Sequence, residues 1–147
     1  MLNRQLVFDT VTSHLLRQGE RSVRIYNRVD ETCAYRGKNG LKCSIGVLIP
    51  DGKYNKSMEG NNAFTAEIAS AIDKQYGSVD STPDPVNDLN SDGTFLWWLQ
   101  WSHDSNYNRG TFLEDTIKRL ANTVERFNLD PFILINCVRA LAQSGAI

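Results

Sequence analysis

The sequence predicts a mainly α protein of the α+β class, with about five helices and a small β-hairpin or strand element in its N-terminal third. Three observations support this fold class. Apolar residues recur at helical spacing near the N-terminus, the next segment alternates apolar and polar residues, and cap or stop signals punctuate the rest. Because the chain shows neither an internal repeat nor a linker-like composition, we expect one domain over residues 1–147.

The first predicted elements are a helix over residues 2–18 and a strand over residues 21–29. Apolar residues from Leu2 to Leu16 return every three or four positions, and Gly19 stands where a helix commonly stops. In the second segment the apolar and polar side chains alternate with a period of two. That period is typical of a half-buried strand.

Asn39-Gly40 is a strong signal for a tight turn, because both residue types tolerate a positive φ. The flanking residues 33–36 and 41–44 are therefore expected to pair as a short hairpin. The apolar run that follows is too short to classify by its period, and Pro50 ends it.

Four further helices are predicted after residue 60. They are expected over residues 63–76, over residues 94 to about 106, from the capping box that starts at Thr111, and from the Asp130-Pro131 start signal to Ser144-Gly145. Residues 78–93 carry two prolines and several aspartates, so we expect a mobile acidic surface loop there.

Composition and charge narrow the class of protein. Apolar residues make up 41% and charged residues 22%, and no apolar run approaches the ~20 residues of a membrane span, so we expect a cytoplasmic protein without a membrane partner. Residues 1–60 hold ten Lys or Arg against six Asp or Glu, whereas residues 61–147 hold six against eleven. An anionic partner is therefore expected at the N-terminal part of the chain.

That N-terminal part mixes cations with aromatic residues. The candidate ligand-binding residues are Arg24, Tyr26, Arg28, Tyr35, Arg36, Lys38, Lys42 and Tyr54. Such surfaces suit phosphates, nucleotides or single strands, although the known phosphate-loop fingerprints are absent. A solvated basic surface without a ligand explains the same composition.

The helix predicted over residues 94 to about 106 is apolar nearly all round. Trp97, Trp98 and Trp101 lie within one arc of its helical wheel. A helix of this kind is usually central and buried, so we expect the tryptophans to contribute mainly buried area. If one of them is exposed, it becomes a candidate for stacking a base or docking a partner.

Few residues could supply nucleophilic catalysis, which needs a base beside the nucleophile. Cys43 or His103 could act with Glu59 or Asp104 as the carboxylate. Because adjacent residues on a helix do not face each other, His103 and Asp104 are not expected to form an orienting pair. The dipole at a helix C-terminus also favours a structural histidine, and a buried structural cysteine explains Cys43 equally well.

Metal ligands are not clustered in the sequence, and we predict no metal or cofactor. Cys33 and Cys43 are separated by nine residues, so we expect them to pack as unbonded, buried small hydrophobes. Asp88, Asn90 and Asp92 match the first half of a calcium loop, which makes them a metal alternative, but the bidentate Glu of that loop is missing. A polar turn in which Asp92 caps the next helix accounts for the same residues.

Two segments carry a family pattern. Residues 33–60 read CAYRGKNGLKCSIGVLIPDGKYNKSMEG, and residues 99–104 read LQWSHD. They resemble a family of small uncharacterised phage and bacterial proteins with the pattern C-x-Y-R-G-x-x-G-x-K-C-A-I-G-x-L-I-P-D-x-x-Y…M-E-G and a later L-Q-x-x-H-D. Ser44 stands where Ala is usual. The resemblance supplies no catalytic role, but it draws attention to Cys33, Tyr35, Arg36, Gly37, Cys43, Tyr54, Glu59, His103 and Asp104.

The resemblance implies an accessory protein that alters host processes or counters host defence in the host cytoplasm. With the composition of residues 24–59, it leads us to expect a binding protein that engages a host factor or sequesters an anionic small molecule such as a signalling nucleotide. The alternative is a hydrolase that uses the candidate catalytic residues named above. Direct binding of nucleic acid is a weaker expectation at a net charge of −1, and the sequence does not predict the oligomeric state.

Glu59, between Met58 and Gly60, is an odd position for a solvated charge. We expect it to be the internal anchor of a compact structure formed by residues 33–60, because a carboxylate there can accept charge-assisted hydrogen bonds. The candidate donors are the Tyr35 and Tyr54 hydroxyls, Arg36, and the backbone of the Asn39-Gly40 turn.

Overall fold

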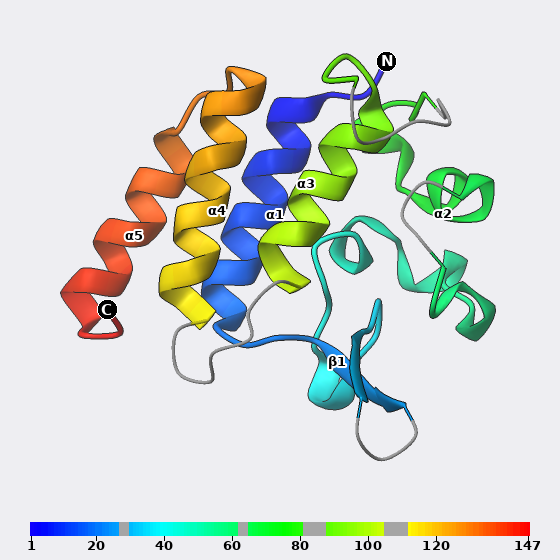
Figure 1. Cartoon of the computed structure of the whole chain (residues 1–147), viewed down its shortest axis with the longest axis horizontal. Coiled ribbons are helices and arrows are strands. Elements are labelled where there is room, and N and C mark those ends of the chain that lie inside the picture. Colours follow the sequence, from blue (N-terminus) through cyan, green and yellow to red (C-terminus); the bar gives the residue numbers. More distant parts are fainter. Residues whose placement is uncertain (27–29, 62–64, 81–87, 105–111) are drawn as a thin grey trace.

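The computed structural model describes residues 1–26, 30–61, 65–80, 88–104 and 112–147, and for residues 25, 26, 30 and 31 it describes the backbone alone. These described residues form five α-helices and one two-stranded antiparallel sheet, which confirms the predicted fold class (Figure 1). The helices are α1 (Arg4–Gln18), α2 (Ala66–Ala71), α3 (Asp92–Asp104), α4 (Phe112–Phe127) and α5 (Phe132–Ser144), and the strands are β1 (Val23–Tyr26) and β2 (Asp30–Cys33).

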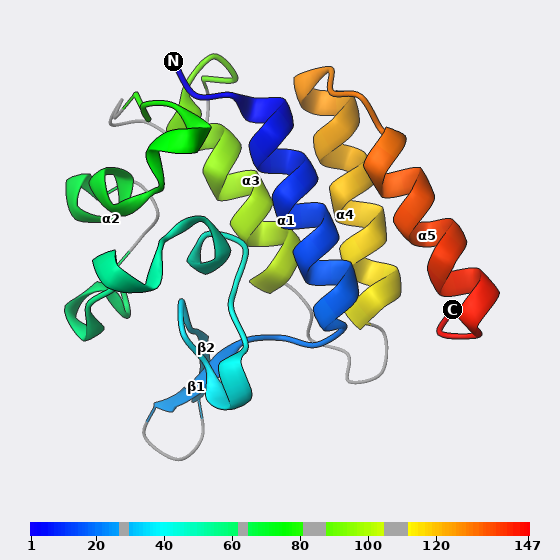
Figure 2. The ribbon, with the colours of Figure 1, turned by 180° about the vertical axis from the view of Figure 1, so that it is seen from behind.

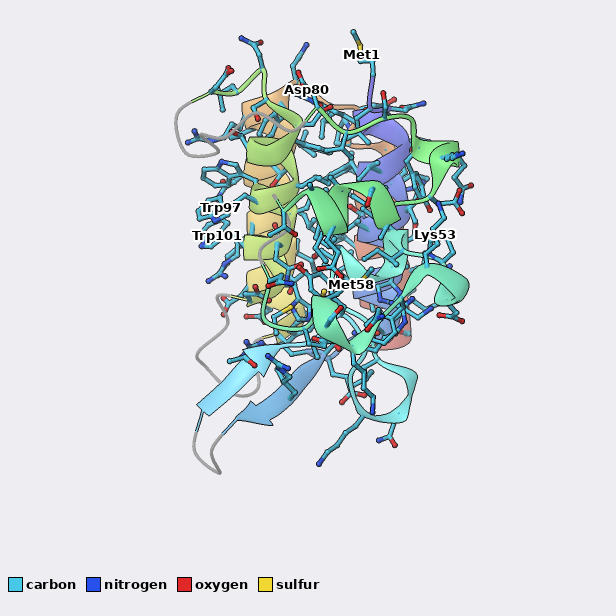
Figure 3. The ribbon with its side chains drawn as sticks, turned by 90° about the vertical axis from the view of Figure 1, so that its right-hand side faces the viewer. Met1, Lys53, Met58, Asp80, Trp97 and Trp101 are labelled. Atoms are coloured by element: carbon cyan, nitrogen blue, oxygen red, sulfur yellow. The ribbon has the colours of Figure 1, made fainter. Side chains whose placement is uncertain are left out.

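The four long helices pack side by side as a bundle, with α1 against α5 and α3 against α4. Figure 2 shows the same arrangement from behind. In the side view of Figure 3, α3 and α4 lie in one layer and α1 and α5 in another. Residues 34–61, which we call the loop layer, run as short 3-10 turns across the α1 and α3 side of this bundle. No helix among the described residues is both long and apolar enough to cross a membrane.

Helix α1 forms where the spacing predicted it. The Asn3 side chain caps its first turn by accepting from the Leu6 N–H at 3.0 Å, and Gly19 ends it in the left-handed conformation at a φ of 72°. Its fully buried residues include Phe8 and Leu15, so the apolar stripe faces the bundle core. Helix α5 likewise follows its predicted cap, because the Asp130 carboxylate accepts from the Phe132 N–H at 2.9 Å.

The single helix predicted over residues 63–76 is wrong. Helix α2 covers only Ala66–Ala71, and a separate 3-10 turn follows over Lys74–Tyr76, while residues 62–64 lie outside the described residues. The break occurs at Asp73, whose N–H donates to the Leu48 carbonyl at 2.9 Å and whose carboxylate caps the next turn. A contact with the loop layer therefore overrides the local helical pattern.

The predicted hairpin around Asn39-Gly40 is also wrong, although both residues have the expected positive φ, at 55° and 76°. The sheet instead pairs β1 with β2, with Val23 opposite Cys33. The flanks of the turn cannot form a ladder because the buried Ser22 hydroxyl lies between them, within hydrogen-bond distance of the Ala34 and Leu41 carbonyls. Of the strand predicted over residues 21–29, Val23–Tyr26 form β1, whereas residues 27–29 and the capping residue Thr111 lie outside the described residues.

Helix α3 begins at Asp92, two residues before its predicted start, and is not buried all round. Phe95, Leu96 and Leu99 are buried, whereas the three tryptophans are only half-buried, so the prediction of a fully buried helix is wrong for them. Figure 3 shows Trp97 and Trp101 projecting from the same side of the helix, away from the bundle. Of the predicted acidic loop, residues 81–87 lie outside the described residues.

Candidate functional site

The family-like pattern builds the loop layer, which folds closely onto itself. At Gly46 an added Cβ would lie 2.3 Å from the Tyr35 carbonyl oxygen, so only glycine permits this approach. At Gly37 it would lie 2.5 Å from the Ser22 hydroxyl oxygen. These two glycines thus serve close approach of the chain to itself.

The Glu59 carboxylate organises the front of the loop layer. It accepts hydrogen bonds from the Tyr35 N–H at 3.1 Å, the Arg36 N–H at 3.0 Å and the Tyr54 hydroxyl at 2.9 Å. We call Glu59 and these three residues the Glu59 cluster. The predicted anchor is confirmed for Tyr54, but the backbone donors come from residues 35 and 36 rather than from the Asn39-Gly40 turn.

The Arg36 side chain does not reach Glu59, contrary to expectation, and instead spans the backbone of the loop layer. Its guanidinium donates to the carbonyls of Gly46 at 2.6 Å and Ile49 at 2.7 Å, and to the Asp51 carboxylate at 3.0 Å. It also lies 4.9 Å from the Tyr54 ring centroid. Because the planar fork serves several acceptors at once, Arg36 is a structural clamp of this layer.

Polar side chains of α1 and α3 attach the loop layer to the bundle. The Gln18 amide pairs with both backbone groups of Lys42, at 2.9 and 3.0 Å, and His14 Nε2 donates to the same Lys42 carbonyl at 2.9 Å. Burial lowers the pKa of His14 below its ordinary value of 6.5. The buried Ser44 hydroxyl donates to the Leu99 carbonyl at 2.8 Å, which gives the serine at this position of the pattern a structural role.

His103 and Asp104 do form an orienting pair, so the expectation that they would not is wrong. His103 Nδ1 lies 2.6 Å from the Asp104 carboxylate, because Asp104 is the last residue of α3. The Ser22 N–H donates to His103 Nε2 at 2.9 Å. Since a backbone N–H can only donate, Nε2 carries a lone pair and the proton lies on Nδ1, pointing at Asp104.

Cys33 and Gln100 complete this second group, which we call the His103 cluster. The Gln100 amide nitrogen donates to the Asp104 carboxylate at 2.8 Å and to the Cys33 sulfur. A hydrogen bond with Cys43, burial and the nearby Asp104 charge raise the pKa of the Cys33 thiol far above its ordinary value. The Asp104 side chain of this cluster is 34% exposed, whereas that of His103 is fully buried.

The two family-like segments therefore meet in space. The N–H of Tyr35 binds Glu59, while burial and the neighbouring Cys43 and Cys33 raise the pKa of its hydroxyl. Tyr35 of the Glu59 cluster thus also lies near Cys33 of the His103 cluster. Residues 33–60 and 99–104 thus contact each other where the loop layer meets the bundle, through Cys33 and Gln100.

The donor atoms of Cys33, His103 and Asp104 lie within 4.8 Å of one another, so we tested them as a metal centre. A metal on Nδ1 of His103 would place a proton on Nε2, directly against the Ser22 N–H. A metal-bound cysteine must also be a thiolate, and here the surroundings favour the thiol. These residues fit a hydrogen-bonded cluster better than a metal site.

The calcium-loop alternative at Asp88, Asn90 and Asp92 is opposed by a side chain from α1. The Arg4 guanidinium binds the Asp92 carboxylate at 3.1 Å and donates to the backbone carbonyls of Leu89 and Asn90. The second Asp92 oxygen accepts from the Asp80 N–H at 3.0 Å. An internal cation thus already binds the Asp92 carboxylate, one of the three candidate calcium ligands.

The catalytic alternatives are enclosed. Cys43 and His103 are both fully buried, and the Gly46 N–H points at the Cys43 sulfur at 3.4 Å. Both ring nitrogens of His103 already have partners, and Glu59 is committed to three donors. The cysteines are unbonded, as expected, and Cys43 packs in the apolar core, whereas Cys33 is only half-buried.

The predicted basic face is largely occupied by internal bonds. Tyr35, Arg36 and Tyr54 belong to the Glu59 cluster, and the Lys42 ammonium lies 3.4 Å from Asp51. Lys38 is exposed on its turn. The Arg28 residue and the Tyr26 side chain lie outside what the structure describes.

Arg24 is, with Lys38, a cation of this face that forms no ion pair with a described carboxylate. It is half-buried, and its guanidinium lies against Gly60, where an added Cβ would be 2.8 Å away. Its Nε donates weakly to the Thr32 hydroxyl at 3.3 Å. Within the described ranges, no carboxylate forms an ion pair with it.

Sequence reasoning missed two contributors to the site, Gln100 and Ser22. Gln100 stands in the L-Q-x-x-H-D pattern, so the pattern itself could have pointed to it. Ser22 contributes a backbone N–H and a hydroxyl from a chain turn, and nothing in its local sequence signals either role.

Comparisons with models of protein families, with curated proteins and with solved structures find no match for this chain. The arguments about function therefore rest on the geometry of these two clusters and of the surface around them.

Proposed function

We propose that the protein is a small binding module that takes an anionic partner on the surface formed by Arg24, Tyr54 and Gly60. One observation carries this proposal. The Arg24 guanidinium lies against Gly60, and no described carboxylate forms an ion pair with it. A guanidinium in this setting suits a phosphate or carboxylate, which it can bind in a bidentate manner.

The Glu59 cluster holds the Tyr54 side chain of this surface in place. Glu59 fixes the Tyr54 hydroxyl, and Arg36 stacks against the Tyr54 ring, so the aromatic part of the surface is held before a partner arrives. A surface prepared in this way loses less conformational entropy on binding than a mobile one. The internal bonds of the family-like residues are therefore the framework of the proposed site, and Arg24 is its contact group.

The proposed partner is a host protein with an acidic surface or an anionic small molecule such as a signalling nucleotide. The resemblance to phage and bacterial proteins motivates the first, with the host cytoplasm as the place of action. The local charge motivates the second, because residues 1–60 carry the cationic excess of the chain. Single-stranded nucleic acid is the third and least favoured partner, at a net charge of −1.

Equilibrium binding of the full chain tests the proposal. Calorimetry at moderate salt would use pyrophosphate, mononucleotides and a short single-stranded oligonucleotide, and immobilised protein would be exposed to host lysate. We expect one of these partners to be retained, and Arg24→Ala to weaken that retention at least about tenfold. Arg139→Ala, an exposed arginine on α5, is the matched control and should leave binding unchanged. Equal binding by both variants, or none by the unaltered chain, would refute the site.

The hydrolase alternative has one supporting observation, the 2.6 Å contact between His103 and Asp104. The same geometry weakens it, because Nε2 of His103 accepts a backbone N–H and cannot take a proton from a nucleophile without breaking that bond. Turnover of an ester or phosphoester substrate that disappears in His103→Gln, with the melting temperature unchanged, would restore it.

A further inference from the structure

A groove lies on the outer side of α3 and α4, formed by residues other than those of the loop layer. It encloses about 550 Å³, within the size range of small-ligand sites. Its lining residues are Leu89, Trp98, Trp101, Asn122, Glu125 and Arg126. Two half-buried tryptophans, a cation, an amide and a carboxylate thus meet in one concavity.

The aromatic floor of this groove is ordered by its own contacts. The Trp98 and Trp101 rings meet edge to face, with centroids 5.0 Å apart and planes at 75°. The Arg126 guanidinium lies 4.2 Å from the Trp98 ring centroid, in stacking range. Arg126 is exposed, and among the described residues it has no ion-pair partner.

The core side of α3 is filled by residues other than these tryptophans. The inner side of α3 is closed by Phe95 and Leu99, both fully buried, and the Phe95 ring packs edge to face on Phe127 of α4 at 5.2 Å. The Trp98 and Trp101 rings lie half-buried at the outer side of the same helix pair, each with a guanidinium of α4 against it, Arg126 and Arg119. Aromatic area gathered around an unpaired guanidinium is typical of a surface that receives a ligand.

We propose that this groove binds a nucleotide unit, a planar base joined to a phosphate. The base stacks on the exposed part of the Trp98 and Trp101 rings, since every base has a π face. The phosphate meets the Arg126 guanidinium, which already lies against Trp98. Asn122 and Glu125 offer an amide and a carboxylate to base edges or sugar hydroxyls.

The same chemistry could come from a free nucleotide or from a nucleotide within a single strand. The composition of this part of the chain favours the free form. Residues 61–147, which include α3 and α4, hold eleven acidic against six basic residues, so a long polyanion is repelled while one phosphate can be met by one arginine. This site is separate from the Arg24 surface, so either proposal can fail alone.

Titrations of the full chain with a purine mononucleotide test the assignment. Binding is measured by the change in tryptophan fluorescence and by calorimetry. The matched probes are the nucleoside, inorganic phosphate and a ten-nucleotide single strand. We expect the mononucleotide to bind best, Trp98→Leu to weaken both the mononucleotide and the nucleoside about tenfold or more, and Arg126→Ala to weaken the mononucleotide by a similar factor but the nucleoside little. Arg139→Ala should change nothing.

Arg126→Ala keeps the test decisive if Trp98→Leu fails to fold, because Arg126 is exposed. The proposal is overturned if the mononucleotide causes neither heat nor quenching up to millimolar concentrations, or if its affinity is unchanged in Arg126→Ala. Loss of nucleotide binding in Arg24→Ala alone would assign the ligand to the other surface. Capture of a protein through Trp98, without nucleotide binding, would also reject the nucleotide assignment.

Discussion

The helical bundle and the loop layer are held together in different ways. In the bundle, Phe8, Phe95 and Leu120 are among many fully buried apolar side chains that share the stabilisation. In the loop layer, which has no long element of its own, the Glu59 and Arg36 side chains bind the backbone of residues 35, 36, 46 and 49. The bundle thus distributes its stability over many contacts, whereas the conformation of the loop layer depends on a few polar atoms.

Apolar burial still docks the loop layer. Ile45, Leu48 and Ile49 are buried and belong to the same core as α1 and α3. Their side chains secure attachment but do not select one backbone conformation, since a short apolar run can adopt several. The hydrogen bonds of Glu59 and Arg36 make that selection. Substitutions in the two regions should therefore differ in what they disturb as well as in how much.

The largest effect is expected in the bundle. Phe95→Ala removes a fully buried ring that packs on Phe127, so it should lower the free energy of unfolding by about 3–5 kcal/mol. Denaturant or thermal unfolding measures this change. Phe132→Ala is the control, because that ring is 63% exposed and its removal should cost far less. Similar losses for the two variants would contradict the bundle as the main source of stability.

The next effect tests the loop layer. Glu59→Gln keeps the shape of the side chain but turns one acceptor into a donor that faces N–H and O–H groups, so we expect a loss of about 1.5–3 kcal/mol. Glu67→Gln, an exposed carboxylate that binds Ser57 and Asn61, should cost much less. An unchanged melting temperature for Glu59→Gln would reject the anchor and return Glu59 to the candidate catalytic residues.

The same contrast explains what the sequence could reveal. The ends of α1 and α5 were predictable because Gly19 and Asp130 are local signals that act within one turn. Tyr54 was predictable as a partner of Glu59 because it is close in sequence. The contacts of Ser22 with His103, and of Arg4 with Asp92, join residues about 80 apart, and no local pattern specifies them.

A smaller effect should appear as a pH dependence of stability. Burial lowers the pKa of His14 in the folded protein, so the unfolded chain binds more protons below about pH 6.5. The contribution of His14 is therefore fully present above that pH and is lost as the pH falls below it. His14→Gln should show a smaller decrease in unfolding free energy between about pH 7 and about pH 5 than the unaltered chain.

His14→Gln isolates this contribution because the other titrating groups are common to both proteins. Lys42 and Arg36 lower the pKa of the Asp51 carboxyl further below its ordinary value of 3.8, so its titration falls outside this window. A steeper pH dependence in His14→Gln than in the unaltered chain would contradict the assignment.

The last comparison is between two thiols. Cys33 lies where the loop layer meets the bundle, and Cys137 lies on α5. A hydrogen bond with Cys43, burial and the charge of Asp104 raise the pKa of the Cys33 thiol well above its ordinary value. Only a thiolate reacts with iodoacetamide. Cys33 should therefore be alkylated more slowly than Cys137 near pH 8, measured by mass spectrometry of the intact and digested protein. Asp104→Asn removes one cause of the raised pKa, so it should accelerate labelling of Cys33 and leave Cys137 unchanged as an internal control. Faster labelling of Cys33 than of Cys137 in the unaltered chain would mean that the His103 cluster activates the thiol. That result would support the catalytic alternative, which the geometry disfavours.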